Sequence, residues 1–305
     1  MPKFRSRIVP VAVSVSLMFV CGCVSHVPAS RRAHFSIHKK AHMEFTSDDV
    51  EQIERNCPFG MPDTSTDWDH GPTHYVVREG YVLQHSALDK IPIWICERVT
   101  KEQLSGDAKR RNRFAADPYL SESQRAELVD YRGTGYDRGH QAPAGNQKKS
   151  QRLKDETFYL SNMAPQVPAF NRKVWRRLEE VTRSWVKDHL GDAYMITGGF
   201  FYDADEEDDV TADGIIEYYV IGPGGVAVPT HFYKIVAAQD EQGQWHAIAF
   251  VLENREYDRP YEFEDYVRSI DWVEERTGLD FMPELDPHSE KRLERNPATL
   301  STFEG

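Results

Sequence analysis

The pattern of apolar and polar residues predicts two groups of β-strands, one on either side of a long helix. Segments 75–85 and 91–99 have the β-branched and aromatic composition of a strand pair. Four more strand-like segments follow the helix and are separated by turns such as Gly-Pro-Gly-Gly; they cover residues 194–202, 216–221, 226–237 and 245–252. We expect these four segments to pair in one antiparallel sheet.

The helix is the most regular element of the predicted fold. It runs from Asn171 to Leu190 and stops at Gly191. Apolar residues recur on one face at helical spacing, namely Val174, Leu178, Val181 and Trp185. The opposite face is mostly basic, with Arg172, Arg176, Glu179, Arg183 and Lys187. The mixture of strands and helices, without an internal repeat, predicts a single α+β domain.

Charge is distributed unevenly over the 305 residues. The formal net charge of −12 argues against attraction of nucleic acid to the protein as a whole. Between residues 138 and 187, however, eleven Lys or Arg outweigh four Asp or Glu, a local balance of +7. We therefore expect a polyanion to bind at this basic segment. The acidic segment 203–217 lacks the spacing of a calcium loop and is expected to be a solvated loop.

The N-terminus has the features of an export signal. Three basic residues among the first seven precede an apolar run over residues 8–20, which is too short for a comfortable membrane span. The Cys-Gly-Cys sequence that follows is similar to a bacterial lipobox, so Cys23 is expected to be lipidated after cleavage. An ordinary cleaved signal without lipid is the alternative. The prediction is an exported protein, anchored as a lipoprotein to the outer membrane or cell surface, or otherwise periplasmic or secreted.

Two further cysteines, Cys57 and Cys96, would remain beyond the signal. In an oxidising compartment they either form a disulfide or stay as two buried thiols, because the sequence does not give the distance between them.

One short segment carries residues suited to phosphodiester hydrolysis. Asp137-Arg138-Gly139-His140 supplies a histidine, whose ordinary pKa lies near neutrality, and an arginine that can neutralise phosphate. Asn171, at the start of the predicted helix, offers an amide oxygen for a hydrated Mg²⁺. A histidine satisfied in a turn and an asparagine that caps the helix are the alternative interpretations. Their combination within the basic segment favours a nuclease.

Four stretches of this region resemble the DNA/RNA non-specific endonuclease family of the ββα-metal, or His-Me finger, type, and within it the endonuclease G-like proteins. They occur in the family's order and comprise Tyr131–His140, Thr157–Pro168, Asn171–Glu179 and Val226–Lys234. Weaker similarity extends from about Phe59 to Leu285. The resemblance implies an α+β, ββα-metal nuclease fold, in which helices flank a central, mostly antiparallel sheet in a single domain.

The resemblance also implies a role for each matching residue. His140 would be the general base, and Asn171 the direct ligand of Mg²⁺, for which Mn²⁺ can substitute. Arg138 would contact phosphate, and Arg183 would act at the phosphate or the leaving oxygen. The residues expected to support them are Asp137, Asn162 and Glu179.

A further arginine is expected shortly before a Phe/Trp-x-x-Asp segment, which is Phe114–Asp117 in this sequence. Arg110, Arg111 and Arg113 all precede it. The resemblance does not choose among them, and Arg111 is the first choice.

The implied reaction is hydrolysis of DNA and RNA to 5′-phosphate and 3′-hydroxyl ends with one bound metal ion. The family often forms homodimers, so a second copy of the chain is a candidate partner, besides nucleic acid and the membrane. A catalytically silent nucleic-acid-binding surface lipoprotein is one alternative, and a phosphodiesterase of small nucleotides is another. The predicted organisation is a signal peptide and lipobox (1–23), a tether (24–55), an endonuclease domain (56–290) and a C-terminal tail (291–305).

Overall fold

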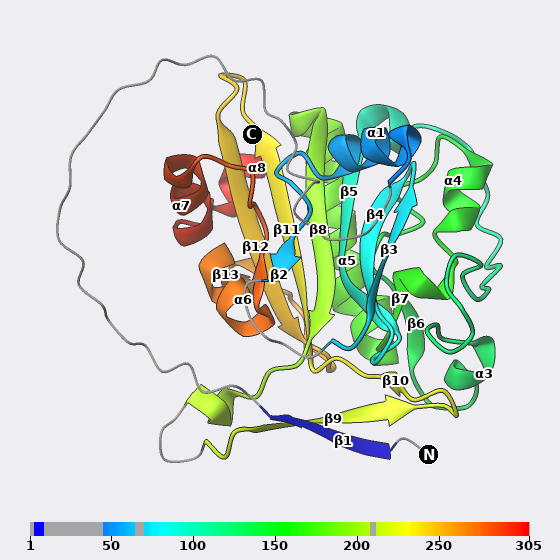
Figure 1. Cartoon of the computed structure of the whole chain (residues 1–305). Coiled ribbons are helices and arrows are strands. Elements are labelled where there is room, and N and C mark those ends of the chain that lie inside the picture. The colour runs from blue at the N-terminus through cyan, green and yellow to red at the C-terminus, as the bar shows by residue number, and fades with distance from the viewer. Residues whose placement is uncertain (1–2, 9–44, 65–69, 208–211, 305) are drawn as a thin grey trace.

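Figure 1 shows the computed structural model of the protein, which describes residues 3–8, 45–64, 70–207 and 212–304. A seven-stranded antiparallel sheet forms its centre, in the order β13-β12-β11-β8-β5-β4-β3. Its strands are β3 (Thr73–Arg78), β4 (Tyr81–Ser86), β5 (Ile91–Thr100), β8 (Asp192–Phe200), β11 (His231–Gln239), β12 (Trp245–Glu253) and β13 (Val267–Arg268). The predicted α+β fold with a mostly antiparallel sheet is confirmed.

Side chains that alternate along the central strands form two cores, one on each face of the sheet. On β11, Phe232 and Val236 belong to one core, whereas Tyr233 and Ile235 belong to the other. Neighbouring residues of a strand point to opposite faces, so an apolar residue at every position serves both cores. The sheet is therefore the middle of three layers.

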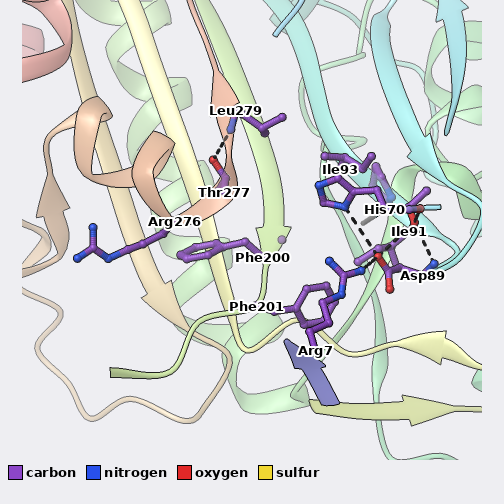
Figure 2. A pocket seen from close by; sticks show the side chains of 13 residues that line it. Arg7, His70, Asp89, Ile91, Ile93, Phe200, Phe201, Arg276, Thr277 and Leu279 are labelled. Atoms are coloured by element: carbon purple, nitrogen blue, oxygen red, sulfur yellow. Dashed lines mark hydrogen bonds and ion pairs between the residues drawn. The ribbon is translucent and has the colours of Figure 1, made fainter. Parts of the chain in front are cut away.

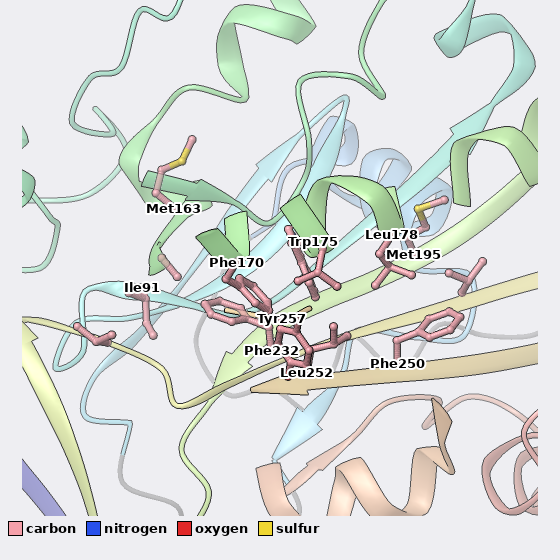
Figure 3. Close-up of a cluster of buried hydrophobic side chains, with 14 of the residues drawn as sticks. Ile91, Met163, Phe170, Trp175, Leu178, Met195, Phe232, Phe250, Leu252 and Tyr257 are labelled. Carbon is pink, nitrogen blue, oxygen red and sulfur yellow. The ribbon is translucent and has the colours of Figure 1, made fainter. Parts of the chain in front are cut away.

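Helices cover both faces of this sheet. One face is covered by α5 (Arg176–Trp185) and the π-helical segments that flank it, η3 (Phe170–Trp175) and η4 (Val186–Leu190), whose buried residues are shown in Figure 3. The other face is covered by α1 (Ser47–Asn56), α6 (Ile270–Thr277) and α7 (Pro287–Arg295). The predicted long helix therefore exists and ends, as expected, at Gly191, which has a φ of +80°.

Short elements connect these layers. The short helices are α2 (Lys101–Leu104), α3 (Leu128–Tyr131), α4 (Gln151–Glu156), α8 (Leu300–Glu304), η2 (Leu160–Asn162), η5 (Ala204–Glu207) and η6 (Phe263–Tyr266). Two small sheets pair β2 (Asp63–Thr64) with β14 (Leu279–Asp280) and β6 (Asp137–His140) with β7 (Met163–Gln166).

The four strand segments predicted after the helix do not all share the central sheet. Segment 216–221 and the start of segment 226–237 belong to a separate sheet as β9 and β10. β9 (Ile215–Ile221) pairs with β10 (Val226–Ala227) across the Gly-Pro-Gly-Gly turn and with β1 (Lys3–Ile8) on its other side. Pro229 separates β10 from β11, and a proline cannot donate a ladder hydrogen bond. The chain therefore changes sheets at this proline.

The described part of the N-terminus is thus a strand. Arg7 of β1 forms an ion pair with the buried Asp89, beside a small cavity that His70 also lines (Figure 2). Basic residues expected to open an export signal are part of a sheet. The apolar run beyond Ile8 and the lipidation predicted at Cys23 lie outside the described residues. Within those residues, no helix combines the length and apolar character that a membrane crossing requires.

The packed domain extends past the boundaries that the sequence suggests. Helix α1 lies in the expected tether, yet it begins with a capping box at Thr46 and buries Ile53 against the sheet. At the other end, α8 lies in the expected tail, and its Phe303 stacks on Trp185 with ring centroids 5.1 Å apart. Cys57 and Cys96 are both buried, and no disulfide joins them.

Candidate active site

Two short strands and the following helix bring most of the predicted site residues together. β6 pairs with β7 in antiparallel register, with His140 opposite Met163. Helical backbone begins at residue 168, and Phe170 and Trp175 of η3 pack on Phe232 of the central sheet (Figure 3). This packing fixes the helix against the sheet, and the strand pair against the helix.

Gly139 occupies a position where a side chain has no room. A Cβ there would lie 2.1 Å from Oε1 of the buried Gln166, far inside van der Waals contact. Gln166 stands opposite Asp137 in the strand pair. The glycine therefore allows β6 and β7 to approach each other and to hold His140 in place.

The His140 ring lies between aromatic rings and two arginines. Its centroid is 4.9 Å from that of Phe158 and 5.8 Å from that of Phe114. Its Nε2 is buried and lacks a hydrogen-bond partner among the described residues, whereas Nδ1 is not enclosed in this way. Burial, together with the charges of Arg110 and Arg138, lowers the pKa of His140 to about 3. The imidazole is therefore neutral near pH 7 and able to accept a proton.

Asn171 lies inside the helical segment and is not its N-cap. Its backbone N–H donates to the carbonyl of Val167 at 3.0 Å, and it belongs to the π-helical turn η3, a geometry that recurs at functional sites. Its Nδ2 donates to Asp137 Oδ2 at 2.9 Å. Because a carboxylate can only accept, this bond fixes the orientation of the amide and leaves Oδ1 to face another partner.

Asp137 joins the strand to the helix. Besides Asn171, it accepts hydrogen bonds from Arg172 Nε at 2.7 Å and from Arg172 Nη2 at 2.5 Å. Partial burial alone would raise the pKa of Asp137, but the bonds from Arg172 and Asn171 outweigh it and hold the pKa below its usual range. The carboxylate therefore stays ionised and keeps the Asn171 amide in place.

Arg138 and Arg110 extend the site over two aromatic rings. The Arg138 guanidinium carbon is 4.0 Å from the centre of the Phe114 ring, and that of Arg110 is 5.2 Å from the centre of the Phe158 ring. Neither arginine has an ion-pair partner among the described residues. Their charges are therefore available to an anion that reaches His140.

Arg111, the first choice from the sequence, is directed elsewhere. It forms an ion pair with Asp155 of α4 at 3.2 Å, and its charge is not among those that shift the pKa of His140. The structure thus brings Arg110, rather than Arg111, together with His140.

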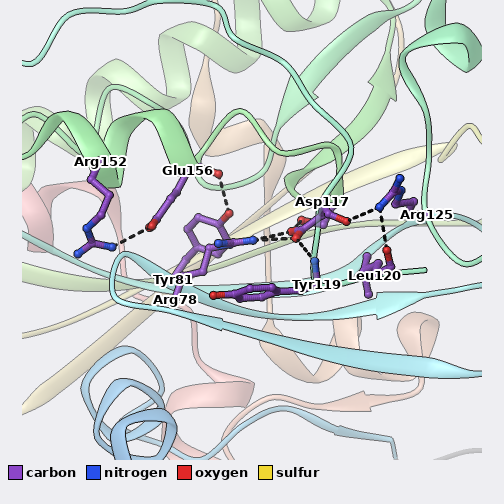
Figure 4. Close-up of polar contacts among 9 residues, drawn as sticks. Arg78, Tyr81, Asp117, Tyr119, Leu120, Arg125, Arg152 and Glu156 are labelled. Atoms are coloured by element: carbon purple, nitrogen blue, oxygen red, sulfur yellow. Dashed lines mark hydrogen bonds and ion pairs between the residues drawn. The ribbon is translucent and has the colours of Figure 1, made fainter. Parts of the chain in front are cut away.

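A buried ion pair holds the segment that carries these arginines. Asp117 accepts hydrogen bonds from Arg78 Nη2 at 2.8 and 2.9 Å and from Ser161 Oγ at 2.5 Å, and it is fully buried (Figure 4). Removing one partner of such a pair typically costs about 3–5 kcal/mol. Asp117 therefore anchors Phe114 against Arg138 and His140, a role that the sequence pattern did not reveal.

Asn162 supports the backbone that follows His140. Its Oδ1 accepts from the Ala142 N–H at 2.8 Å, and its Nδ2 donates to the carbonyls of Ala142 and Thr157 at 2.9 and 2.8 Å. The amide is fully buried and its hydrogen bonds are used within the fold. It positions the chain around His140 and does not face the site.

Glu179 and Arg183 continue the site along α5. Arg183 Nη1 lies 3.6 Å from Glu179 Oε2 and donates to Asn146 Oδ1 at 3.3 Å. Burial raises the pKa of Glu179, while the charges of Arg183, Lys234 and Arg110 act in the opposite direction. The charge of Arg110 therefore acts on the pKa of both His140 and Glu179.

Two buried charges beneath α5 were not predicted from the sequence. Lys234 is fully buried, donates to Thr197 Oγ1 at 2.7 Å and lies over the Trp175 ring. Glu97 is also buried, and desolvation raises its pKa to about 7, although Lys234 acts to lower it. Both stand within strands of apolar residues, where a sequence pattern predicts only core. Of the two, Lys234 carries the positive charge, and it acts to lower the pKa of both Glu97 and Glu179.

The donor set fits a hard divalent cation. An amide oxygen of Asn171, the carboxylate of Glu179 two turns further along the same helix and two arginines without ion-pair partners among the described residues match the ligands and phosphate contacts that a hydrated Mg²⁺ site uses. The orientation of the Asn171 amide is the main support for this fit. Its Nδ2 is held by Asp137, whereas its Oδ1, a hard oxygen ligand, stays available to a cation.

Comparison with known proteins gives consistent results. The sequence profile of the DNA/RNA non-specific endonuclease family matches residues 69–288. Human mitochondrial endonuclease G is 38% identical over 209 residues, 68% of this chain and 69% of that protein. Nuclease C1 of Cunninghamella echinulata is 37% identical, covering 75% and 87%, and the mitochondrial nuclease of Saccharomyces cerevisiae is 36% identical, covering 73% and 70%. A chain of the solved EndoG/EndoGI complex superposes with a TM-score of 0.68 at 32% identity, covering 77% and 93%.

These relatives correct one prediction. The human and Saccharomyces nucleases are mitochondrial, which does not fit an exported, membrane-anchored lipoprotein. The predicted localisation is therefore wrong, and the interpretation of the Cys-Gly-Cys sequence as a lipid anchor has no support. A short apolar run after basic residues was a weak basis for it, since its basic residues pair with β9.

Proposed function

The chain belongs to the DNA/RNA non-specific endonuclease family and is an endonuclease, and from this premise we propose that it hydrolyses phosphodiester bonds of both DNA and RNA, with Mg²⁺ bound at Asn171 and His140 as the general base. The proposal rests on one observation above all. Asp137 fixes the Asn171 amide, and the strand of Asp137 also carries the neutral His140, whose pKa is influenced by two arginines that have no ion-pair partner among the described residues.

Asn171 Oδ1 would be the direct protein ligand of the cation, and Glu179 would accept hydrogen bonds from its water molecules. When bound, the cation would stabilise negative charge on the phosphate and on the departing oxygen. Mn²⁺ has the same preference for oxygen ligands and would substitute.

His140 would take the proton from the attacking water. We assign this role to Nδ1, because Nε2 is buried between the aromatic rings and would carry the ring proton. The water oxygen forms a bond to phosphorus as the bond to the 3′ oxygen breaks. The products are a 5′-phosphate and, after the 3′ oxygen takes a proton from solvent, a 3′-hydroxyl. The 2′-hydroxyl takes no part, so both polymers are substrates.

Arg138 and Arg110 would bind the phosphate and also tune the base. In the free protein their charges and burial hold the pKa of His140 near 3, which is low for an efficient base near neutral pH. A phosphate paired with both arginines compensates those charges and raises the pKa towards the working pH. Substrate binding would therefore activate the histidine.

The other residues would act by positioning. Asp137 orients Asn171, Asn162 holds the backbone after His140, and Arg183 places Glu179 and assists at the phosphate or leaving oxygen. The family assignment gives no support to the catalytically silent lipoprotein alternative. The basic helix favours polymers over small nucleotides, because neutralising successive phosphates requires several cations.

The test is cleavage of supercoiled plasmid and of single-stranded RNA by the full chain, with MgCl₂, MnCl₂ or EDTA. We expect both polymers to be cut with either metal, no cutting in EDTA, and products that bear 5′-phosphates. Cutting that persists in EDTA, or products with 3′-phosphates, would contradict the proposed chemistry.

A further inference from the structure

A second group of carboxylates lies on the face of the sheet opposite α5, far from the endonuclease motif in the sequence. It is formed by side chains from α6, β14 and α7, which pack beside one another at the C-terminal end of the domain (Figure 1). The members are Asp271, Glu274, Asp280, Glu290 and Glu294.

These carboxylates form two overlapping groups of three, each with the spacing of ligands around one ion. Asp271, Glu274 and Glu294 each place an oxygen within 4.8 Å of the other two, and so do Asp280, Glu290 and Glu294. Oxygens bound to one calcium ion at about 2.4 Å lie at most about 4.8 Å apart. Glu294 belongs to both sets and is therefore their centre.

Glu294 itself points to a missing partner. Its side chain is 5% exposed, and its Oε1 is buried without a hydrogen-bond partner among the described residues. A buried carboxylate oxygen that accepts no hydrogen bond is costly unless a cation or proton meets it. The position of this oxygen among four other carboxylates favours a cation.

The surroundings do not supply the compensating charge. Every charged group that shifts the pKa of Glu294 is another carboxylate of the cluster, and with burial they raise it to about 8. Burial likewise raises the pKa of Glu274 to about 7. Arg295 pairs with Asp271 at 3.3 Å on the exposed side. Glu274, Glu290 and Glu294 form no ion pair with a cationic side chain among the described residues.

We propose that these five carboxylates form a divalent-cation site of the calcium type, separate from the catalytic metal site. All its ligands are hard oxygens, and more of them converge than a hydrated Mg²⁺ usually takes from protein. Calcium accepts six to eight oxygens in flexible geometry, which suits ligands from two helices and a strand.

The site would secure a C-terminal segment that extends beyond the family's common domain. The family profile ends at residue 288, so Glu290 and Glu294 lie outside the matched region. Helix α7 contributes Leu293 to the core, and Phe303 of α8 stacks on Trp185, the last residue of α5. A cation that joins α7 to α6 would stabilise this whole extension.

The test is thermal unfolding of the full chain, first in EDTA and then with CaCl₂. Calcium at a hundredfold excess over its Kd should raise Tm by roughly 5–10 °C. The Asn171→Ala variant, which lacks the catalytic ligand, should keep this shift. Glu294→Gln should lose it, and equilibrium dialysis with ⁴⁵Ca²⁺ should show less calcium bound to Glu294→Gln than to Asn171→Ala.

The Glu294→Gln variant is expected to fold, because it removes one of five clustered charges while preserving shape. A calcium shift that Asn171→Ala abolishes and Glu294→Gln retains would overturn the proposal, since the catalytic site would then account for it. The absence of any calcium shift in the parent protein would also overturn it, and would mean that the cluster shares protons instead.

Discussion

The endonuclease site and the carboxylate cluster are two polar sites built on opposite faces of one sheet, and they use opposite charges. The proposed endonuclease site has one fixed amide oxygen, a neutral histidine and two arginines without an ion-pair partner in the described part of the chain. The cluster has a buried glutamate, Glu294, and four other carboxylates. The endonuclease site suits a cation that binds together with an anionic substrate. The carboxylate cluster suits a cation that is bound permanently.

The difference lies in how each site treats charge before anything binds. Burial and the charges of Arg110 and Arg138 lower the pKa of His140, so the histidine is a weak base before substrate binds. The same two charges can bind a phosphate. Clustered carboxylates repel one another in the folded protein, and a bound cation reduces this repulsion. Cation binding therefore stabilises the folded state. Loss of one site should therefore affect turnover, and loss of the other should affect stability.

The largest expected effect is on the ligand of the endonuclease site. Asn171→Ala should lower kcat by about 10³-fold or more, because the metal loses its protein ligand. Tm in EDTA should change little, since the side chain is only half-buried. Glu294→Gln is the matched comparison, with kcat within about twofold of the parent. Equal loss of cleavage in both variants would break the separation of the two sites.

The second effect separates neighbouring arginines. Arg110→Ala should reduce kcat/KM by about 10²-fold, the scale of one lost transition-state contact. Arg111→Ala should change it by less than about threefold, because its partner is Asp155 at the surface. Steady-state cleavage of a short labelled duplex measures both. The reverse order would restore Arg111 as the phosphate contact.

The third effect is a pH dependence of stability. In EDTA the folded pKa of Glu294, about 8, lies above its unfolded value near 4.3, so the folded state binds more protons between these limits. Its contribution to stability is present below about pH 4 and is lost as pH rises towards 8. Tm in EDTA should therefore fall over this range more in the parent than in Glu294→Gln, and calcium should reduce the difference. Parallel curves in EDTA would contradict the cluster's role.

The smallest effect is a shift in the titration of His140. NMR of the free protein should show a pKa well below 6.5, because burial and two arginines disfavour the charged ring. Arg138→Ala and Arg110→Ala should each raise this pKa, whereas Arg111→Ala should leave it unchanged. An ordinary pKa in the parent protein would remove the argument that phosphate binding activates the base.

The sequence was sufficient where the determining residues are close together. The period of apolar residues from Val174 to Trp185 predicted the helix, and the Asp-Arg-Gly-His sequence indicated His140 as the candidate base, although it did not indicate that these residues form a strand. The bond between Asp137 and Asn171, by contrast, joins residues 34 apart in the sequence and was found only in the structure. Local patterns such as the period of apolar residues fix both the element and the residues that it presents.

The sequence failed where distant segments decide. The choice of Arg110 over Arg111 depends on residues more than forty positions further along the chain, because Arg110 lies over the Phe158 ring whereas Arg111 pairs with Asp155. The grouping of acidic residues also depends on distant segments. The acidic run at 203–217 drew attention in the sequence, but the convergent carboxylates come from three separate elements between residues 271 and 294. Pairing of the basic N-terminal segment with β9 was equally invisible to a local pattern.

The central claim is that His140 is the base of an endonuclease acting on both sugar types. The most direct test is single-turnover cleavage of a DNA and an RNA of matched sequence by the parent chain, His140→Ala and His189→Ala, all with Mg²⁺. His189 is exposed at the end of the same helix and controls for loss of an imidazole. We predict that His140→Ala loses about 10³-fold or more on both polymers while His189→Ala stays within about twofold. Undiminished cleavage of either polymer by His140→Ala would contradict the mechanism.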